Sequence, residues 1–242
     1  LYDNDILPPA DSKTCCSLDD SEDARSVAFR LGMPFYVFNS KAEFEEKVIR
    51  NFISCYECGA TPNPCIECNR HLKFDHFLHK ALVLGCDYIV TGHYARIRYD
   101  EATDRYLLLK AADITKDQSY VLYCLTQEQL SRTLMPVGEY SKEEIRRIAE
   151  KEGLRVANKP DSQDICFVPD GDYDGFIEET VGDALPVGNF VTLDGKILGP
   201  HKGITHYTVG QRKGLGLALG YPAFVIEIRP ESNEVVIGTM ED

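Results

Sequence analysis

Hydrophobic positions in the first half of the chain alternate between helical spacing and short apolar runs. Helical spacing covers residues 19–31, 42–56 and 69–84, and apolar runs of strand length lie at 35–38 and 88–90. Connections between parallel strands need about a dozen residues, which a helix usually supplies. The pattern therefore predicts an α/β fold in which helices cover a parallel sheet.

A hairpin and a capped helix follow these elements. Residues 95–98 and 106–109 are strand-like and flank a polar turn, which is typical of a β-hairpin. Ser141 and Glu144 have the spacing of a capping box and predict the start of a helix that runs to Glu150. A β-ribbon is therefore expected beside the parallel sheet.

The pattern changes again after Pro160, where glycines become more frequent and helical spacing fades. Strands are expected at residues 189–193, 221–228 and 235–237. The final strands have no obvious closing partner before Asp242. We therefore expect a second, β-rich region whose last β-domain is cut short.

The charge of the chain is acidic overall but unevenly distributed. Its 242 residues include 26 Lys and Arg against 39 Asp and Glu, a formal net charge of −13, so a nucleic-acid partner would need a local basic patch. Residues 196–226 offer one, because they contain no acid, whereas residues 161–195 contain no Lys or Arg. No apolar stretch approaches the roughly 18 to 20 residues of a membrane span, and the first residues do not form a signal peptide. We expect a cytoplasmic protein with no membrane partner.

The chain contains nine cysteines, an odd number that cannot be paired completely in intramolecular disulfides, so metal or redox chemistry is favoured over a disulfide framework. Cys55, Cys58, Cys65 and Cys68 form two C-x-x-C pairs, a spacing that suits zinc or an iron-sulfur cluster. The spacer between the pairs is short and contains two prolines, and Cys55 lies on the apolar face of its expected helix. A four-cysteine zinc site and a merely buried Cys55 therefore both remain open.

Two cysteines are candidates for reactive thiols. The turn at residues 61–64 precedes a helix whose first turn is expected to hold Cys68, where the helix dipole lowers the pKa of a thiol. Cys166 lies in a polar loop that begins at Lys159 and is therefore expected to be accessible. Cys68 as an unreactive residue near the helix start is the alternative.

Three other segments have the composition of binding sites. Thr91, Gly92 and His93 follow an expected strand, where a small residue lets a ligand approach the backbone, although His93 could equally be structural. Residues 116–120 combine a cation, an acid and polar groups, with a capped helix start as the alternative. Residues 201–216 interleave cations, aromatics and glycines, which suits phosphate contacts and base stacking as well as a solvated turn.

Five motifs in this order resemble the tRNA-specific 2-thiouridylases. They are T-P-N-P-C-I-x-C-N at residues 61–69, T-G-H-Y-A-R at 91–96, K-D-Q-S-Y at 116–120, D-S-Q-D-I-C-F at 161–167 and G-Q-R-K-G-L-G at 210–216. The resemblance covers essentially the whole chain. It implies an ATP-dependent enzyme that replaces O2 of the wobble uridine, position 34 of certain tRNAs, with sulfur.

The resemblance also implies an architecture: a parallel-sheet nucleotide-binding domain of the PP-loop, Rossmann-like kind, a small central domain and a C-terminal β-barrel. On this chain we expect an ATP-binding catalytic domain at residues 1–165, a central tRNA-contacting domain at 166–221, and the beginning of a truncated barrel at 222–242. The family's Ser-Gly-Gly-Val-Asp-Ser-Ser phosphate loop is absent, so we expect the fragment not to turn over ATP by itself.

The family's functional residues can be carried over to matching positions. Cys166 matches the cysteine that bears a persulfide, and Cys68 matches its partner, with ATP and Mg²⁺ activating the uridine oxygen. The adenosine-binding edge matches Thr91, Gly92 and His93. Expected tRNA contacts are Lys116, Asp117, Gln118, Lys202, His206, Gln211, Arg212 and Lys213. A sulfur-relay protein or a cysteine desulfurase is the expected sulfur donor.

One departure from the family concerns Cys65, where many relatives have an aspartate proposed to assist proton transfer. Cys65, Cys68 and Cys166 could alternatively be three ligands of a [4Fe-4S] cluster with one open iron site, a plan that related tRNA thiolases use. The spacing does not separate the cluster mechanism from the persulfide mechanism.

Two further classes of function compete with sulfur transfer. A non-catalytic, zinc-bearing RNA-binding fragment would use Cys55, Cys58, Cys65 and Cys68 and would be indifferent to Cys166. An ATP-using enzyme of another kind, such as an amidotransferase partner, would leave the paired thiols unexplained.

Overall fold

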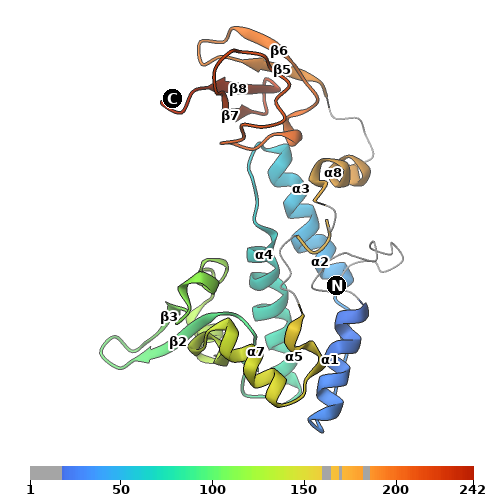
Figure 1. The fold of residues 1–242 in the computed structure, drawn as a ribbon, viewed down its shortest axis with the longest axis vertical. Helices are drawn as coiled ribbons and strands as arrows, with labels where there is room; N and C mark the ends of the chain where they lie inside the picture. Colours follow the sequence, from blue (N-terminus) through green and yellow to red (C-terminus); the bar gives the residue numbers. More distant parts are fainter. Residues whose placement is uncertain (1–17, 160–164, 169–170, 182–185) are drawn as a thin grey trace. The chain divides into compact units, whose positions relative to one another are not determined.

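The structure is a computed structural model that describes residues 18–159, 165–168, 171–181 and 186–242 (Figure 1). The chain divides into two compact units. The first unit comprises residues 1–48 and 64–167, and the second comprises residues 49–63 and 168–242.

Helices of the first unit agree largely with the sequence pattern. Helix α1 spans Leu18–Arg30, and α2 (Lys41–Phe44) continues through the π-helical turn η1 (Glu45–Ile49) into α3 (Arg50–Glu57) of the second unit. The predicted helix at 42–56 is thereby confirmed, and Phe44, Val48 and Phe52 on its apolar face are each only 1% exposed. A second helical stretch is formed by α4 (Pro64–Glu67), the π-helical η2 (Cys68–His76) and α5 (Phe77–Val83).

The apolar run at 35–38 does not form the predicted strand. No residue of this run is assigned to a strand, and the side chains of Tyr36 and Val37 are 70% and 73% exposed. An extended run becomes a strand only when a neighbouring strand accepts its backbone hydrogen bonds, and no described strand does so here.

Two small sheets complete the first unit. Strand β1 (Ile89–Val90) pairs in parallel with β4 (Thr133–Leu134), as the α/β pattern predicts. Strands β2 (Ala95–Asp100) and β3 (Arg105–Lys110) form the predicted hairpin, with Ala95 opposite Lys110 and Asp100 opposite Arg105. The shared core consists of Phe74, Leu78, Ala81, Ile89, Ala95, Val121, Leu122 and Met135.

Short elements link these sheets. They are η3 (Ile114–Lys116), η4 (Ser119–Val121), α6 (Gln127–Ser131), η5 (Pro136–Glu139), α7 (Lys142–Lys151) and η6 (Arg155–Asn158). The predicted capping box is present, because the Ser141 hydroxyl accepts from the Glu144 N–H while the Glu144 carboxylate accepts from the Ser141 N–H. Gly138 of η5 lies so close to Ala95 that a Cβ at this position would be 1.8 Å from the Ala95 carbonyl oxygen.

The second unit contains α3, α8 (Tyr173–Val181), the turn η7 (Ile204–His206) and a mixed sheet. Its strand order is β6 (Ile197–His201), β5 (Gly188–Val191), β8 (Glu234–Gly238) and β7 (Phe224–Arg229). β5 and β8 are parallel, whereas the outer pairs are antiparallel. All three predicted strands are confirmed, and within the described residues the sheet is open. Its core consists of Phe190, Tyr207, Leu215, Val225, Val235 and Ile237.

Each edge strand of this sheet has a feature that hinders pairing with a further strand. Edge strand β6 contains Pro200, which has no N–H for a further ladder. On β7, the Val225 carbonyl accepts from the Gly210 N–H at 2.7 Å, and the Val225 N–H donates to the Gln211 carbonyl at 2.9 Å. The segment around Gly210 therefore covers part of the β7 edge.

Within the residues that the structure describes, no helix has the length and apolar character needed to cross a membrane.

Candidate functional site

Two of the candidate cysteines lie at the start of the helical stretch formed by α4, η2 and α5. This stretch begins at Pro64, so its first turn is Pro64–Glu67 and contains Cys65. The prediction that Cys68 lies in the first turn is wrong, because proline is well accepted at the first helical position and the helix starts there. The field of a helix terminus fades beyond the first turn, so it acts more strongly on Cys65 than on Cys68. Cys65 is exposed, whereas Cys68 is 9% exposed.

Cys166 lies in a short described segment of the first unit and is half-buried. The next two residues anchor it, since Phe167 is 6% and Val168 only 1% exposed. The Phe167 ring packs edge-on against the Phe44 ring with centroids 5.7 Å apart. Residues 160–164 of the predicted polar loop lie outside the described residues. Cys166 is thus tied to a buried aromatic contact and is less accessible than the loop composition predicted.

The turn after β1 contains the predicted adenosine-binding residues. The Thr91 N–H donates to the Leu134 carbonyl at 3.0 Å, which extends the parallel pairing of β1 and β4 by one residue. Gly92 is exposed, and a side chain placed there would meet no atom of the protein within 4 Å. The glycine therefore leaves open space at the carboxyl end of a parallel strand, where ligands of α/β folds bind.

His93 is the most electrostatically perturbed residue of this turn. Its Nδ1 lies 3.0 Å from the Thr91 hydroxyl, and its ring centroid is 5.7 Å from that of Phe74. Burial, aided by the nearby Lys73 ammonium, lowers the pKa of His93 from 6.5 to about 4. His93 is therefore neutral at pH 7, with hydrogen-bonding capacity but no positive charge for phosphate.

Asp117 and Gln118 use their side chains within the protein. The Asp117 carboxylate accepts from the Ala111 N–H at 2.8 Å and the Ser119 hydroxyl at 2.7 Å. Burial acts to raise the pKa of Asp117, but these hydrogen bonds outweigh it and lower that pKa overall. Gln118 binds the backbone of Tyr94 twice. Its side-chain oxygen accepts from the Tyr94 N–H at 2.9 Å, and its backbone N–H donates to the Tyr94 carbonyl at 2.8 Å. Both residues shape the segment that presents Lys116.

Lys116 is exposed at a surface pocket near the start of α7. The pocket brings Lys116 together with Lys142 and Arg146, neither of which the sequence pattern had indicated. Glu139 and Glu143 line the same pocket, so its charge is mixed.

Three contacts join the cysteine-bearing helical stretch, the turn after β1 and the 116–121 segment. The contacts are Asn69 to Val121, Phe74 to His93, and Gln118 to Tyr94. The Asn69 side chain is 1% exposed, and its Nδ2 donates to the Val121 carbonyl at 3.0 Å. Sequence reasoning missed this role of Asn69, although its place directly after Cys68 in a motif was a usable signal. Three motifs far apart in the sequence are therefore built around one core.

The predicted tRNA-binding residues of the second unit fall into two groups. Lys202, Arg212 and Lys213 are exposed, and Arg212 lines a pocket with the glycine-rich residues 214–223. The Gln211 side chain instead binds within its own loop, accepting from the Thr208 N–H at 2.9 Å and donating to the Lys213 carbonyl at 3.0 Å. Gln211 therefore shapes the loop that carries the two cations.

His206 is held by helix α8 and is largely shielded from solvent. Its Nδ1 lies 3.1 Å from an Asp174 oxygen and its Nε2 lies 3.0 Å from a Glu178 oxygen, and its side chain is 13% exposed. Both ring nitrogens are thus occupied by carboxylates. This arrangement favours a role in attaching α8 to η7 over a direct phosphate contact.

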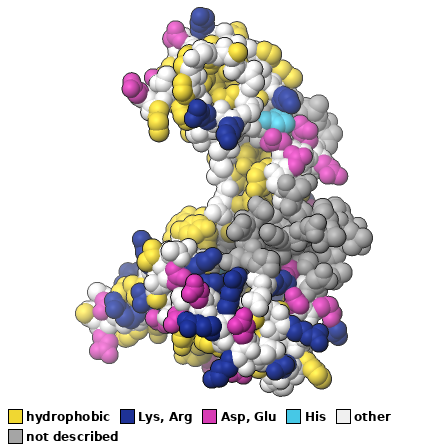
Figure 2. Space-filling view, in the orientation of Figure 1, with side chains coloured by type: hydrophobic (Ala, Val, Ile, Leu, Met, Phe, Trp, Pro, Cys, Tyr) yellow, Lys and Arg dark blue, Asp and Glu magenta, His cyan; other side chains and the backbone are white. Residues whose placement is uncertain are grey.

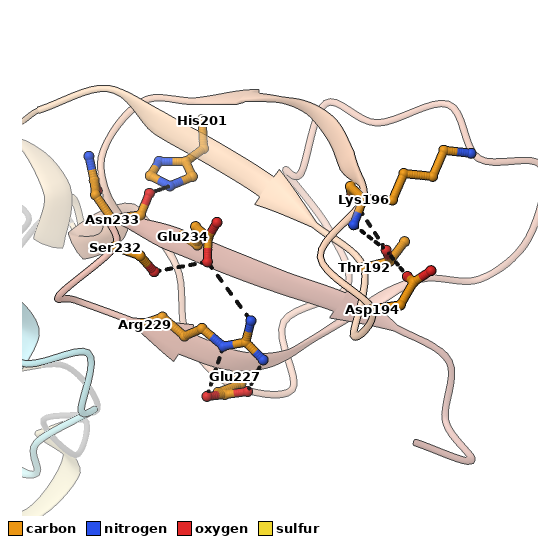
Figure 3. A network of polar contacts seen from close by, with 9 residues as sticks. All are labelled: Thr192, Asp194, Lys196, His201, Glu227, Arg229, Ser232, Asn233 and Glu234. Atoms are coloured by element: carbon orange, nitrogen blue, oxygen red, sulfur yellow. Dashed lines mark hydrogen bonds and ion pairs between the residues drawn. The ribbon is translucent and has the colours of Figure 1, made fainter.

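Other polar side chains of the second unit bind one another around the mixed sheet (Figure 3). His201 is 2% exposed, its Nε2 lies 3.1 Å from the Asn233 carbonyl, and burial lowers its pKa. Arg229 binds the Glu227 carboxylate through two hydrogen bonds of 3.1 and 3.0 Å and lies 3.8 Å from Glu234. These groups stabilise the sheet and do not belong to the exposed basic surface.

A metal ion needs several donor side chains that converge on one point. Among the described residues, no three His, Cys, Asp or Glu side chains converge on a point that could hold a metal ion. The residues of the four-cysteine zinc site are divided between the units, because Cys55 and Cys58 lie in the second and Cys65 and Cys68 in the first. The set Cys65, Cys68 and Cys166 does not form such a group either.

Family models match nearly the whole chain. A family model described as the tRNA methyl transferase HUP domain matches residues 4–170, and one described as the tRNA methyl transferase PRC-barrel domain matches residues 174–239. The first unit thus corresponds mostly to a nucleotide-binding α/β domain, and the mixed sheet lies in the PRC-barrel match.

Curated relatives are similar to the chain along nearly its whole length. A tRNA-specific 2-thiouridylase MnmA of Lachnoclostridium phytofermentans is 58% identical over 99% of this chain and 67% of its own length. Those of Clostridioides difficile and Carboxydothermus hydrogenoformans are 55% and 56% identical, over 94% and 93% of this chain and 63% and 61% of their own lengths. The chain therefore spans roughly two-thirds or less of the length of these relatives. Matches of this extent and identity show that the chain belongs to the tRNA-specific 2-thiouridylase family.

Proposed function

We propose that the chain contributes the thiol chemistry and part of the RNA surface of an ATP-dependent tRNA uridine 2-sulfurtransferase. The reaction would replace O2 of the wobble uridine, position 34, with sulfur. The observation that carries this proposal is the similarity, over nearly the whole chain, to proteins named tRNA-specific 2-thiouridylase. The joining of the Cys68 helix, the Thr91–His93 turn and the Lys116 segment around one core supports it.

Cys166 and Cys68 would divide the sulfur chemistry between them. The uridine oxygen attacks the α-phosphorus of ATP and pyrophosphate leaves, and the terminal sulfur of a Cys166 persulfide then attacks C2, so that AMP leaves with that oxygen. The Cys68 thiolate then attacks Sγ of Cys166, so the sulfur–sulfur bond to the substrate breaks and thiolated tRNA is released. A Cys68–Cys166 disulfide remains, which an external thiol reduces. Both cysteines lie in the first unit, as this exchange requires.

ATP, with Mg²⁺, would bind at the edge formed by Thr91, Gly92 and His93. The open space beside Gly92 admits a ligand close to the backbone. Neutral His93 offers a hydrogen bond, and the Thr91 N–H is already used within the sheet. These residues would recognise the base or the ribose, because they supply no positive charge for phosphate.

The exposed cations Lys116, Lys202, Arg212 and Lys213 would contact tRNA phosphates. The internal hydrogen bonds of Asp117, Gln118 and Gln211 and the contacts of His206 with two carboxylates support a positioning role for these four residues. A sulfur-relay protein or cysteine desulfurase would load Cys166 in the cytoplasm.

The experiment compares Cys166→Ser and Cys68→Ser with Cys86→Ser, whose thiol is exposed but belongs to no motif. Unmodified tRNA, ATP and a persulfide donor are incubated anaerobically with the full-length protein, and thiolated tRNA is detected by retardation on a mercury gel. We expect product with the parent protein and Cys86→Ser, and none with Cys166→Ser. Product from Cys166→Ser at the parent rate would overturn the assignment of Cys166.

The same assay with and without iron separates the persulfide from a [4Fe-4S] mechanism. The failure of Cys65, Cys68 and Cys166 to form a metal-binding group favours the persulfide, so we expect product without metal. Product that requires iron would instead assign these three cysteines to a cluster.

A further inference from the structure

The β2–β3 ribbon has one buried face and one outward face. Residues directly opposite each other in an antiparallel pair share a face, and successive residues alternate. Ala95 belongs to the core, and the opposed pair Ile97 and Leu108 packs against it. The alternate positions therefore face outward, and they are Arg96 and Leu109, Arg98 and Leu107, and Asp100 and Arg105.

Contacts at both ends hold this ribbon in place. The Gln127 side chain of α6 accepts from the Tyr106 N–H at 2.8 Å and donates to the Tyr106 carbonyl at 2.9 Å, as a neighbouring strand would. At the other end, Arg96 Nε donates to the Lys110 carbonyl at 2.8 Å, and its guanidinium lies 3.5 Å from Glu139. A surface held in place in this way loses little conformational entropy when a partner binds.

Two of the outward arginines take no part in these contacts. Arg98 and Arg105 are exposed, and in the described part of the chain no hydrogen bond or ion pair engages either guanidinium. Two of the three acids of the turn accept hydrogen bonds, Asp100 from the Thr103 hydroxyl at 2.6 Å and Asp104 from the Tyr99 hydroxyl at 2.5 Å, whereas the third, Glu101, is exposed. Over this part of the first unit, Lys and Arg side chains (dark blue) are interspersed with Asp and Glu side chains (magenta) (Figure 2).

The spacing and chemistry of these arginines fit a polyanion. Alternate residues of a strand lie about 7 Å apart, so Arg96 and Arg98 form a row of cations along one face. Guanidinium groups bind phosphate oxygens in a bidentate manner, and the half-buried Leu107 and Leu109 lie beside their aliphatic stems. A protein with a net charge of −13 needs local surfaces of this kind to bind RNA.

We propose that the outward face of the β2–β3 ribbon, with Arg98 and Arg105 as its free cations and Arg96 at its base, binds the phosphate backbone of the RNA substrate. This inference rests on the proposed function and adds to it a contact surface far in sequence from residues 201–213. Contacts to phosphates position an RNA without reading its bases. The ribbon would therefore serve every tRNA substrate alike.

The test is the salt dependence of tRNA binding, measured by fluorescence anisotropy with unmodified tRNA and the full-length protein. The double variant Arg98→Ala/Arg105→Ala is compared with Arg147→Ala/Lys151→Ala, which removes two exposed cations from α7 and changes the net charge equally. Loss of two phosphate contacts lowers the slope of log affinity against log salt by about 1.5. We expect this change, with affinity more than tenfold weaker at about 0.1 M salt, in the ribbon variant alone.

Each other outcome has a definite meaning. A ribbon variant that matches the parent in affinity and slope overturns the inference and leaves an acidic protein as the partner of the ribbon. An equal loss in both double variants also overturns it, because only net charge would then matter. If the parent binds and thiolates tRNA in either case, the proposed function stands. A parent protein that does not bind tRNA refutes both proposals.

Discussion

Replacing His93 with glutamine should remove a specific acid sensitivity of the fold. Burial and Lys73 hold the pKa of His93 at about 4 in the folded chain, against 6.5 for a solvated histidine. Above about pH 6.5 the imidazole is neutral in both the folded and the unfolded chain, so it adds no pH dependence. Between about pH 6.5 and 4 the unfolded chain binds the proton first, so stability falls as the pH falls.

The size of this effect follows from the two pKa values. Each pH unit between them is worth about 1.4 kcal/mol, so the parent loses about 3 kcal/mol from this one group by about pH 4. His93→Gln does not titrate, but it loses the contact with the Phe74 ring, which is worth about 1 kcal/mol. The variant should therefore be less stable than the parent at pH 7 and more stable near pH 4.

Urea unfolding at steps between about pH 7 and about pH 4 measures this difference. His79→Gln is the matched control, because His79 is exposed on α5 and has no comparable burial. The control should follow the parent at every pH. Parallel stability curves for the parent and His93→Gln would refute the argument that His93 is buried in its neutral form.

Three further substitutions test the framework of the first unit. Ser141→Ala removes the hydroxyl of a capping box and should cost about 1 kcal/mol, measured by thermal unfolding; an unchanged Tm would contradict the cap. Gly138→Ala puts a methyl group against the Ala95 carbonyl oxygen and should cost about 3 kcal/mol or more, seen as a loss of soluble protein; normal yield and Tm would disprove this close approach. Asn69→Leu leaves the Val121 carbonyl without its donor and should cost about 1 to 3 kcal/mol in urea unfolding, whereas a neutral effect would mean that this bond is not formed.

Local signals in the sequence predicted much of the fold. The helix at 42–56 followed from the spacing of Phe44, Val48 and Phe52, and the structure buries all three. The capping box at Ser141 was equally readable, because both of its hydrogen bonds join residues three positions apart. Such features depend on neighbours in the sequence and need no knowledge of tertiary contacts.

Features that depend on distant residues were not readable in the same way. The apolar run at 35–38 has the composition of a strand, but composition does not say whether a partner strand is at hand. His206 looked like part of a basic surface, and only the fold brings Asp174 and Glu178 to its ring. The sequence predicted Cys68 in the first turn of its helix, whereas it follows that turn, because the pattern did not show that the helix starts at Pro64.

The covered edges of the mixed sheet affect how the chain behaves at high concentration. Open edge strands can recruit a strand from another molecule, which leads to aggregation. Pro200 interrupts the ladder on β6, and Gly210 and Gln211 already bond to Val225 on β7. Edge-to-edge self-association through this sheet is thereby disfavoured until the segment around Gly210 detaches. Substitutions that loosen this segment would therefore lower solubility before they unfold the sheet.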